Sequence, residues 1–353
     1  MSRFLAALLA LFVALGALPG CSAASTSEFG PIALLLPDKK TARYDTFDRP
    51  VFEQRVHELG DYDVLYANAD QDAAKQQQQA ESALAAGAGV LVLDPVDARA
   101  AVTIVTAANA QSVPVISYDR LIAGGDIAYY ISFDNERVGE LQATALVDAL
   151  RARGDTDPGI LMVNGSPTDS NADLFRDGAR RILSASDVQI LAEFDTPDWS
   201  PDKAQSWVAG QISQFGSRIS GVYAANDGTA SGAVAALRAA DVRPFPIVTG
   251  QDAELTALQR IVSGDQYMTV YKALKRQAAR AAEVAVDLLH GRAVTAETDV
   301  DGTPATLLDP VAVTIDTMLD TVVADGFWTI EDICTPEYAD ACIAQGLITE
   351  DAG

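Results

Sequence analysis

The sequence predicts an α/β protein with two doubly wound parallel sheets. Apolar segments of β character alternate with helical segments whose apolar residues recur about every 3.6 positions, such as 135–153 and 254–262. A chain of 353 residues exceeds a typical domain of about 100–150 residues, so two lobes are expected. We predict four strand–helix units between about 30 and 133 and a second set over 134–270.

Most of the apolar segments stop on polar residues that can form hydrogen bonds. The carboxyl ends of parallel strands meet at one edge of a sheet, and ligands bind in the crevice there. These polar residues are therefore expected to converge. In chain order they are Asp38, Asp94, Asp119-Arg120, Asp134-Asn135, Asp169-Ser170-Asn171, Asp198-Trp199, Asn226-Asp227, Gln251-Asp252 and Lys272.

Some of these polar residues have a simpler interpretation. Asp and Asn commonly cap the helix that follows a strand, or lie in an exposed loop. We interpret Asp94, Asp134, Asn135 and Asp227 mainly in this way. The remaining carboxylates can accept hydrogen bonds and the Arg, Lys and Asn side chains can donate them, a mixture that suits a ligand with many hydroxyl groups.

The N-terminus predicts export. Arg3 precedes an apolar run that is shorter than the roughly 20 residues needed to span a bilayer, so residues 1–20 are predicted to be a signal peptide. The run ends in Leu18-Pro19-Gly20-Cys21, which resembles a bacterial lipoprotein cleavage box. Cys21 would then be acylated, and residues 21–30 would form a tether that anchors the protein to the outer side of the cell membrane. Cleavage near Ala23, giving a soluble secreted protein, is the alternative.

The net charge argues against one class of ligand, and the Cys and His residues bear on disulfide formation and metal binding. A formal net charge of -24 argues against nucleic acid, whose phosphates would be repelled. Once Cys21 is assigned to lipidation, Cys334 and Cys342 remain, and an oxidising location favours a disulfide over two free thiols. His57 and His290 stand alone on predicted helices, so neither a metal nor a cofactor is expected.

Signatures of enzymes are weak in this chain. The sequence contains no G-x-S-x-G elbow, no Walker loop and no G-x-G-x-x-G after the first apolar segment. Asp169 and Asp252 could serve as an acid and base pair for glycoside hydrolysis, which leaves a secreted carbohydrate-active enzyme open. Arg43, Arg120 and Lys272 accompany them and favour recognition of hydroxyls over proton transfer.

Several segments together carry a family resemblance. They occur over most of the chain in the order VISYDRLI, YYISFDNERVGELQATALVD, GSPTDSNADLFRDG, YAANDGTASGA, GQDAE and MTVYK. The chain resembles the periplasmic xylose-binding and multi-sugar-binding proteins, which are solute-binding components of ABC transporters with the type I periplasmic binding fold. This resemblance implies two lobes joined by a hinge of three crossings, near 133–135, 269–272 and 309–315.

The resemblance also implies a set of sugar contacts. Matched position by position, they are Arg43, Tyr44, Arg120, Asp169, Asn171, Trp199, Asn226, Asp252 and Lys272. Family members often have Trp where this chain has Tyr44, and the smaller ring puts the identity of the sugar in question. The apolar C–H face of a pyranose suits Trp199, with Tyr44 or Phe133 as further candidates.

The resemblance implies the following organisation and function. The N-terminal lobe would comprise 31–133 and 273–311, the C-terminal lobe 134–272 and 312–330, and 331–353 would be an extension with the disulfide. A monomer would deliver a monosaccharide, D-xylose ahead of glucose, galactose or arabinose, to an ABC permease and its ATPase subunit. Presentation of the sugar to a sensory receptor stays open. A related sugar-responsive repressor would need a DNA-binding helix-turn-helix where this chain has its signal.

Overall fold

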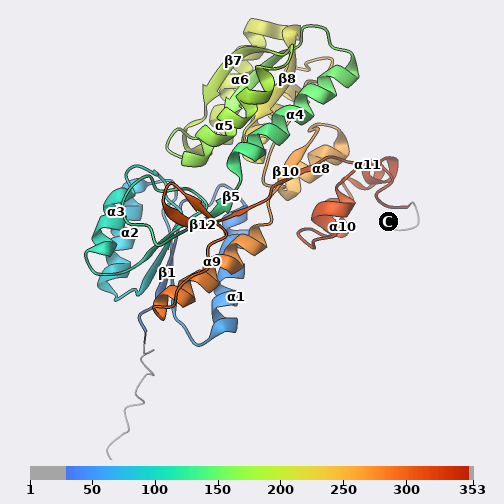
Figure 1. Ribbon diagram of the computed structural model, residues 1–353. Helices are drawn as coiled ribbons and strands as arrows, with labels where there is room; N and C mark the ends of the chain where they lie inside the picture. The colour runs from blue at the N-terminus through green and yellow to red at the C-terminus, as the bar shows by residue number, and fades with distance from the viewer. Residues whose placement is uncertain (1–28, 350–353) are drawn as a thin grey trace, which may run out of the picture.

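The computed structural model describes residues 29–349 and confirms the α/β fold with two parallel-sheet lobes (Figure 1). The predicted signal peptide and Cys21 lie outside the described residues. Among residues 29–349, no helix combines the length and apolar character needed to cross a membrane. The same part of the chain contains no group of three or more His, Cys, Asp or Glu residues that could hold a metal ion.

The first lobe is built on a seven-stranded sheet with the order β11-β12-β5-β4-β3-β1-β2. Its strands are β1 (Ile32–Leu36), β2 (Val64–Asn68), β3 (Val90–Leu93), β4 (Val115–Tyr118), β5 (Tyr129–Phe133), β11 (Thr298–Val300) and β12 (Thr303–Leu308). All neighbours are parallel except β11 and β12, which form an antiparallel pair at one edge.

Helices cover both faces of this sheet. Strand β1 is therefore buried on both sides, which explains why its sequence is continuously apolar. Ile32, Leu34 and Leu36 belong to the core under α1 (Arg49–Leu59) and α9 (Leu274–Leu289). Ala33 and Leu35 belong to the opposite core, under α2 (Ala73–Ala85) and α3 (Val102–Asn109). A strand buried on both faces has no polar side, which is typical of parallel sheets.

The second lobe repeats this arrangement around the sheet β7-β6-β8-β9. Its strands are β6 (Gly159–Asn164), β7 (Gln189–Asp195), β8 (Ile219–Ala224) and β9 (Ile247–Val248). Ile160 and Met162 of β6 face the core of α4 (Asn135–Arg153) and α5 (Ser170–Leu183), whereas Leu161 and Val163 face the core of α6 (Pro201–Phe215) and α7 (Asp227–Ala239).

Three segments connect the lobes. The first runs directly from the end of β5 into α4. The other two lie side by side, because β10 (Thr269–Tyr271) pairs antiparallel with β13 (Val311–Val313), with Val270 opposite Ala312. After β10 the chain enters α9 of the first lobe, and before β13 it leaves β12 of the same lobe.

The C-terminal part of the described chain packs beside the second lobe. It contains the π-helical turn η4 (Leu319–Val323), α10 (Ile330–Ile333) and α11 (Ala339–Ala344). The predicted disulfide is present between Cys334 and Cys342, and both short helices lie against α8 (Leu255–Ser263) (Figure 1).

The predicted element count was wrong in two places. Between 30 and 133 the structure has five strands rather than four, because β2 forms at the edge of the sheet and is only partly buried. The return of the chain after α9 contains β11, β12 and β13, which were not expected. β11 lacks the continuous apolar character on which the prediction depended, whereas β2 is apolar from Val64 to Ala67 and was overlooked.

Candidate functional site

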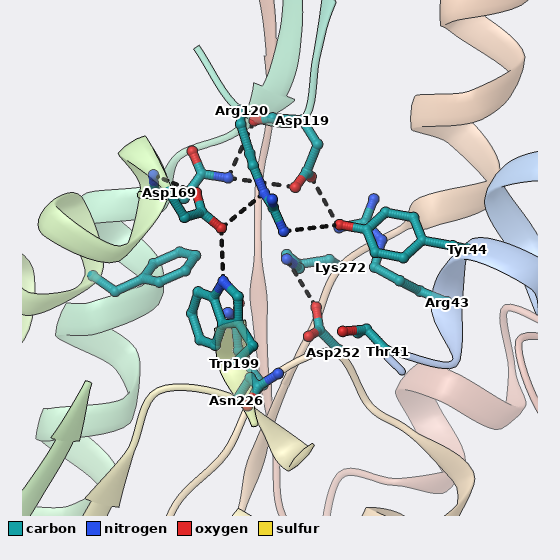
Figure 2. Close-up of a pocket in the computed structure, with 13 residues that line it drawn as sticks. Thr41, Arg43, Tyr44, Asp119, Arg120, Asp169, Trp199, Asn226, Asp252 and Lys272 are labelled. Atoms are coloured by element: carbon teal, nitrogen blue, oxygen red, sulfur yellow. Dashed lines mark hydrogen bonds and ion pairs between the residues drawn. The ribbon is translucent and has the colours of Figure 1, made fainter. Parts of the chain in front are cut away.

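The polar ends of the strands converge on a pocket between the two lobes (Figure 2). All nine residues predicted as sugar contacts line this pocket. The full lining consists of Thr41, Arg43, Tyr44, Asp119, Arg120, Asp169, Asn171, Phe175, Trp199, Asn226, Gln251, Asp252 and Lys272. The pocket encloses about 310 Å³ of space, part of it open to solvent.

Arg43 is the most firmly held side chain of the first lobe. Its Nε and Nη2 donate to the two carboxylate oxygens of Asp48 at 2.9 and 2.8 Å. Nη1 donates to Asp119 Oδ1 at 2.9 Å, and Nη2 also donates to Gln277 Oε1 at 2.8 Å. Two carboxylates and an amide therefore fix the plane of the guanidinium, so the position that it presents to a ligand is set in advance.

Arg120 connects the two lobes. Its Nη2 donates to the hydroxyl of Tyr44 at 3.2 Å and its Nη1 donates to the carbonyl of Pro95 at 2.9 Å. Its Nε lies 2.8 Å from Asp169 Oδ2 in the second lobe. That contact is an ion pair without hydrogen-bond geometry, since the Nε–H has no hydrogen-bond partner among the described residues.

The interpretation of Asp94 as a cap or an exposed residue was wrong. Its side chain is fully buried, and Oδ1 lies 3.3 Å from Arg120 Nε. Neither carboxylate oxygen accepts a hydrogen bond from the described part of the chain. Burial raises the pKa of Asp94 well above its usual value, although the charge of Arg120 opposes this shift. Asp94 therefore supports Arg120 from behind and does not line the pocket.

Asp169 and Asn171 lie at the start of α5, where capping and pocket formation coincide. Asp169 Oδ1 accepts the backbone N–H of Asn171 at 2.9 Å, while Oδ2 accepts the indole Nε1–H of Trp199 at 3.0 Å. Asn171 Nδ2 donates across the cleft to the carbonyl of Asp119 at 3.2 Å. Local helix capping thus aims both side chains at the first lobe.

Asn135 and Asp134 differ from each other in role. Asp134 caps α4 by accepting the backbone N–H of Arg137 at 3.0 Å, as expected. Asn135 was also expected to be a cap or exposed, which was wrong, because it is buried and its Nδ2 donates to Asn171 Oδ1 at 2.9 Å. It holds the amide of Asn171 in the orientation that reaches Asp119.

Asp252 and Lys272 form the charged pair of the second crossing. Lys272 Nζ lies 2.8 Å from Asp252 Oδ1 and 5.5 Å from the ring centre of Phe133. Phe133 therefore lies beneath the ammonium group and is not one of the lining residues. The neighbouring Gln251 Oε1 is buried and accepts no hydrogen bond from residues 29–349. Buried acceptors normally have partners, so this oxygen favours a polar ligand.

An aromatic wall faces this polar side. Phe175 and Trp199 have their ring centres 6.4 Å apart at an interplanar angle of 67°. Sequence reasoning identified Trp199 but missed Phe175, which lies four positions after Asn171 on the same face of α5. It also left Thr41, Asp119 and Gln251 out of the contact set, although the last two directly precede predicted contacts at the ends of strands.

The charges in the pocket largely compensate one another. Burial alone would raise the pKa of Asp119, but Arg43, Lys272 and Arg120 hold it well below its usual value. Burial raises the pKa of Asp169, and Arg120 opposes this shift. The site is therefore a set of fixed donors and acceptors, which suits the binding of a neutral polyhydroxylated molecule.

Two further carboxyl groups, those of Asp227 and Glu254, lie near Asp252. Asp227 was expected to be a cap or exposed, which was wrong, because it is fully buried and accepts hydrogen bonds from Gln266 Nε2 at 2.8 Å and from the backbone N–H of Glu254 at 2.9 Å. The cap of α7 is Asn226, which accepts the N–H of Thr229. Burial, with the nearby charge of Asp252, raises the pKa of Asp227 to about 7. Burial, with repulsion from Asp227 and Asp252, raises the pKa of Glu254 to about 8.

Comparison with known proteins identifies the family. Residues 32–293 match the model of the periplasmic binding protein domain. The chain belongs to the periplasmic binding protein family. It is 34% identical over 332 residues to the D-xylose-binding periplasmic protein of Haemophilus influenzae, covering 92% of this chain and 98% of the relative. The protein of the same description from Escherichia coli is 35% identical over 304 residues, covering 84% and 90%.

A solved structure agrees with this periplasmic binding protein along nearly its whole length. The carbohydrate transporter solute-binding protein of Chloroflexus aurantiacus, in complex with D-glucose, superimposes with a TM-score of 0.78 at 28% identity, covering 87% of this chain and 98% of that one. Members of the family are transport receptors, so this chain is a non-enzymatic binding protein. The pair Asp169 and Asp252 is accordingly not a catalytic dyad.

Proposed function

We propose that this periplasmic binding protein captures a monosaccharide, with D-xylose preferred, and delivers it to an ABC permease and its ATPase subunit. The observation that carries the proposal is the pocket between the lobes. Arg43, Arg120 and Asn171 line it together with the Asp252–Lys272 ion pair and with Gln251, whose buried Oε1 accepts no hydrogen bond from residues 29–349, beside the rings of Phe175 and Trp199. A pyranose offers both hydroxyls for such groups and apolar C–H faces for the rings.

The choice of D-xylose rests on the relatives. Two relatives at 34% and 35% identity are described as D-xylose-binding. Glucose, galactose and arabinose are the competing ligands, and the Chloroflexus structure with D-glucose makes glucose the first of them to test.

We also propose an organisation that matches this role. The N-terminal lobe comprises 31–133 and 273–311, and the C-terminal lobe comprises 134–272 and 312–330. Acylation of Cys21 anchors the monomer to the outer side of the cell membrane, and periplasmic relatives support an extracytoplasmic location. Mass spectrometry of the N-terminal peptide from a lipoprotein-processing host checks the anchor, and a mature terminus beyond Cys21 without lipid contradicts it.

A panel of sugars tests the ligand. A ligand that binds only the folded state raises the free energy of unfolding by RT ln(1 + [L]/Kd), so thermal shifts rank affinities directly. We expect D-xylose to give the largest shift among D-xylose, D-glucose, D-galactose and L-arabinose, with calorimetry to follow. A larger shift with another of these sugars replaces D-xylose as the ligand, and no response to any of them contradicts the sugar-binding proposal.

A further inference from the structure

The C-terminal segment, defined here as residues 325–349, lies beyond the residues that match the family model and contacts both sides of the pocket. One apolar cluster joins Phe47 of the first lobe and Ala253 of the second lobe to Phe327, Ile333 and Cys342 of this segment. In Figure 1, α10 and α11 lie beside α8, whose first residue follows the Asp252 turn closely.

Trp328 contacts the turn that presents Asp252 to the pocket. Its indole Nε1–H donates to the carbonyl of Ala253 at 2.9 Å. Asp252 and Ala253 have φ angles of 95° and 50°, so two consecutive non-glycine residues adopt positive φ values that L-residues rarely take. Such a conformation persists only where its surroundings impose it.

Two further restraints on this turn come from the second crossing, besides the N–H of Glu254 that donates to Asp227 Oδ2 at 2.9 Å. The N–H of Asp252 donates to the carbonyl of Val270 at 2.9 Å, and the N–H of Ala253 donates to Thr269 Oγ1 at 3.2 Å. Both restraints act on backbone N–H groups from the β10 side. The indole of Trp328 instead binds the carbonyl of Ala253, so it restrains the turn from the C-terminal segment and not from β10.

Phe327 extends the same contact to the first lobe. Its ring stacks on that of Phe47, with centres 4.0 Å apart and an interplanar angle of 18°, and Trp328 meets Phe47 edge-on at 5.2 Å. Phe47 belongs to the π-helical turn η1 (Tyr44–Asp48), which begins at the pocket residue Tyr44 and contains Asp48, the partner of Arg43. The aromatic pair therefore touches the turns that carry pocket residues of both lobes.

The segment is itself fixed to the second lobe. Ile333 and Cys342 are fully buried in the cluster that contains Leu258 and Ile261 of α8. The Cys334–Cys342 disulfide closes the segment next to these contacts, and Thr329 starts α10 with a capping box. Trp328 and Phe327 are consequently presented from an anchored support and not from a free chain end.

We propose that Trp328 and Phe327 are positioning residues for the sugar site: Trp328 holds the Asp252 turn, and the Phe327–Phe47 stack couples that turn to the Arg43 side of the closed cleft. The expected effect on affinity rests on the proposed sugar-binding function. Loss of either contact weakens the closed complex and releases the sugar faster, while the open cleft admits it as before.

The variant Trp328→Phe tests the first half, because it removes the indole donor and keeps an aromatic ring. With D-xylose, or whichever sugar the wild type binds in the panel, we expect about a three- to ten-fold loss of affinity, mainly as a faster dissociation rate in stopped-flow fluorescence. Trp207→Phe is the matched control, since Trp207 stacks on Phe194 outside the pocket, and should leave both values unchanged. Unchanged dissociation in Trp328→Phe overturns the positioning role.

The variants Phe47→Leu and Phe327→Leu test the second half in a double-mutant cycle. Each is expected to weaken binding a few-fold, and the double variant should lose less than the product of the two single losses, because both remove the same contact. Strictly multiplicative losses overturn the coupling. Thermal stability of the sugar-free variants is measured in parallel, and a fall in stability without any change in dissociation rate marks a merely structural contact and contradicts the proposal.

Hydrogen exchange of the sugar-free protein separates this inference from the proposed function. The Trp328→Phe variant should speed up amide exchange in a peptide that spans residues 251–256, whereas Trp207→Phe should not. This measurement needs no ligand. If the wild type binds none of the tested sugars, the proposed function is contradicted, but the effect of Trp328 on the Asp252 turn can still be measured. Equal exchange in the wild type and Trp328→Phe overturns the inference itself.

Discussion

The carboxylate of Asp169 caps a helix with one oxygen and lines the pocket with the other. Asn226 combines the same two roles at α7. At the scale of single residues, one polar side chain after a strand can therefore both cap a helix and line the pocket. The cap fixes its rotamer, and that rotamer decides where its second polar atom points.

Asp252→Ala is expected to weaken sugar binding at least about ten-fold. A hydrogen bond to a charged group contributes roughly 1.5–3 kcal/mol, and the variant also leaves Lys272 without its partner at 2.8 Å. Calorimetry with the bound sugar measures the change. An affinity within two-fold of the wild type would show that Asp252 does not contact the ligand.

Asn226→Ala and Asn226→Ser separate capping from ligand binding. Alanine removes both the cap and the amide, so we expect weaker binding together with a loss of about 0.5–2 kcal/mol in the free energy of unfolding. Serine keeps a capping oxygen, so it should restore the stability but not the affinity. Recovery of affinity in the serine variant would assign Asn226 to capping alone.

Asp94→Ala is expected to impair binding although Asp94 does not line the pocket. Its removal takes a buried carboxyl group away from Arg120, which contacts Tyr44 and Asp169 in the site. We expect a several-fold loss of affinity by calorimetry. Asp134→Ala is the control, because it removes an exposed cap and should lower stability by about 1 kcal/mol without changing affinity. If Asp94→Ala leaves the affinity unchanged, as Asp134→Ala should, Asp94 does not support the site.

At the scale of elements, α7 and α8 bring two carboxyl groups together behind the pocket. Asp227 opens α7, and Glu254 directly precedes α8. Their pKa values of about 7 and about 8 lie above those of unfolded carboxyls, about 4. The folded protein thus binds protons more tightly than the unfolded chain, so this pair contributes less stability as the pH rises from about 4 to 8.

Glu254→Gln is therefore expected to flatten the pH dependence of stability. Between pH 5 and 8, the free energy of unfolding should fall less steeply in the variant than in the wild type, because one member of the repelling pair no longer ionises. Urea unfolding at several pH values measures both slopes. Glu337→Gln, at an exposed position, is the control and should keep the wild-type slope; a wild-type slope in Glu254→Gln as well would refute the coupling.

The elements also show how far the sequence predicts the site. Strand exits such as Asp169 and Asp252 were predictable because parallel strands end at a common edge. Phe175 was not, since an apolar residue on a helix face is indistinguishable by pattern from core. β11 lacks a continuous apolar run, and the run of β13 is only three residues long. The contact of Trp328 with Ala253 spans 75 residues and depends on how the C-terminal segment folds back.

At the scale of the whole molecule, polar contacts beside the pocket join the two lobes directly. Arg120 pairs with Asp169, Asn171 donates to Asp119, and the N–H of Ala98 donates to the carbonyl of Thr168 at 3.0 Å. These contacts favour a closed arrangement by themselves. A sugar adds to that preference only through interactions that are stronger in the closed than in the open state.

Closure should consequently track sugar binding in solution. The proposed contacts come from both lobes, with Arg43 and Arg120 on one side and Asp169, Trp199 and Asp252 on the other. We expect a saturating sugar to lower the radius of gyration in small-angle scattering and to change Trp199 fluorescence in step. Hinge closure of this kind is an established motion of periplasmic binding proteins.

Asp169→Asn tests whether the ion pair across the cleft contributes to that closure. The amide keeps the shape and can still accept the indole N–H of Trp199, but it loses the charge that faces Arg120. We expect the sugar-free variant to be more open than the sugar-free wild type, with a larger radius of gyration and a larger contraction at saturating sugar. Its affinity should fall, because part of the binding free energy then closes the cleft. Trp207→Phe provides the scattering control. If wild type and Asp169→Asn give superimposable sugar-free curves and contract equally, the Arg120–Asp169 pair does not bias the lobes; if neither contracts with a sugar that calorimetry shows to be bound, ligand-driven closure is wrong.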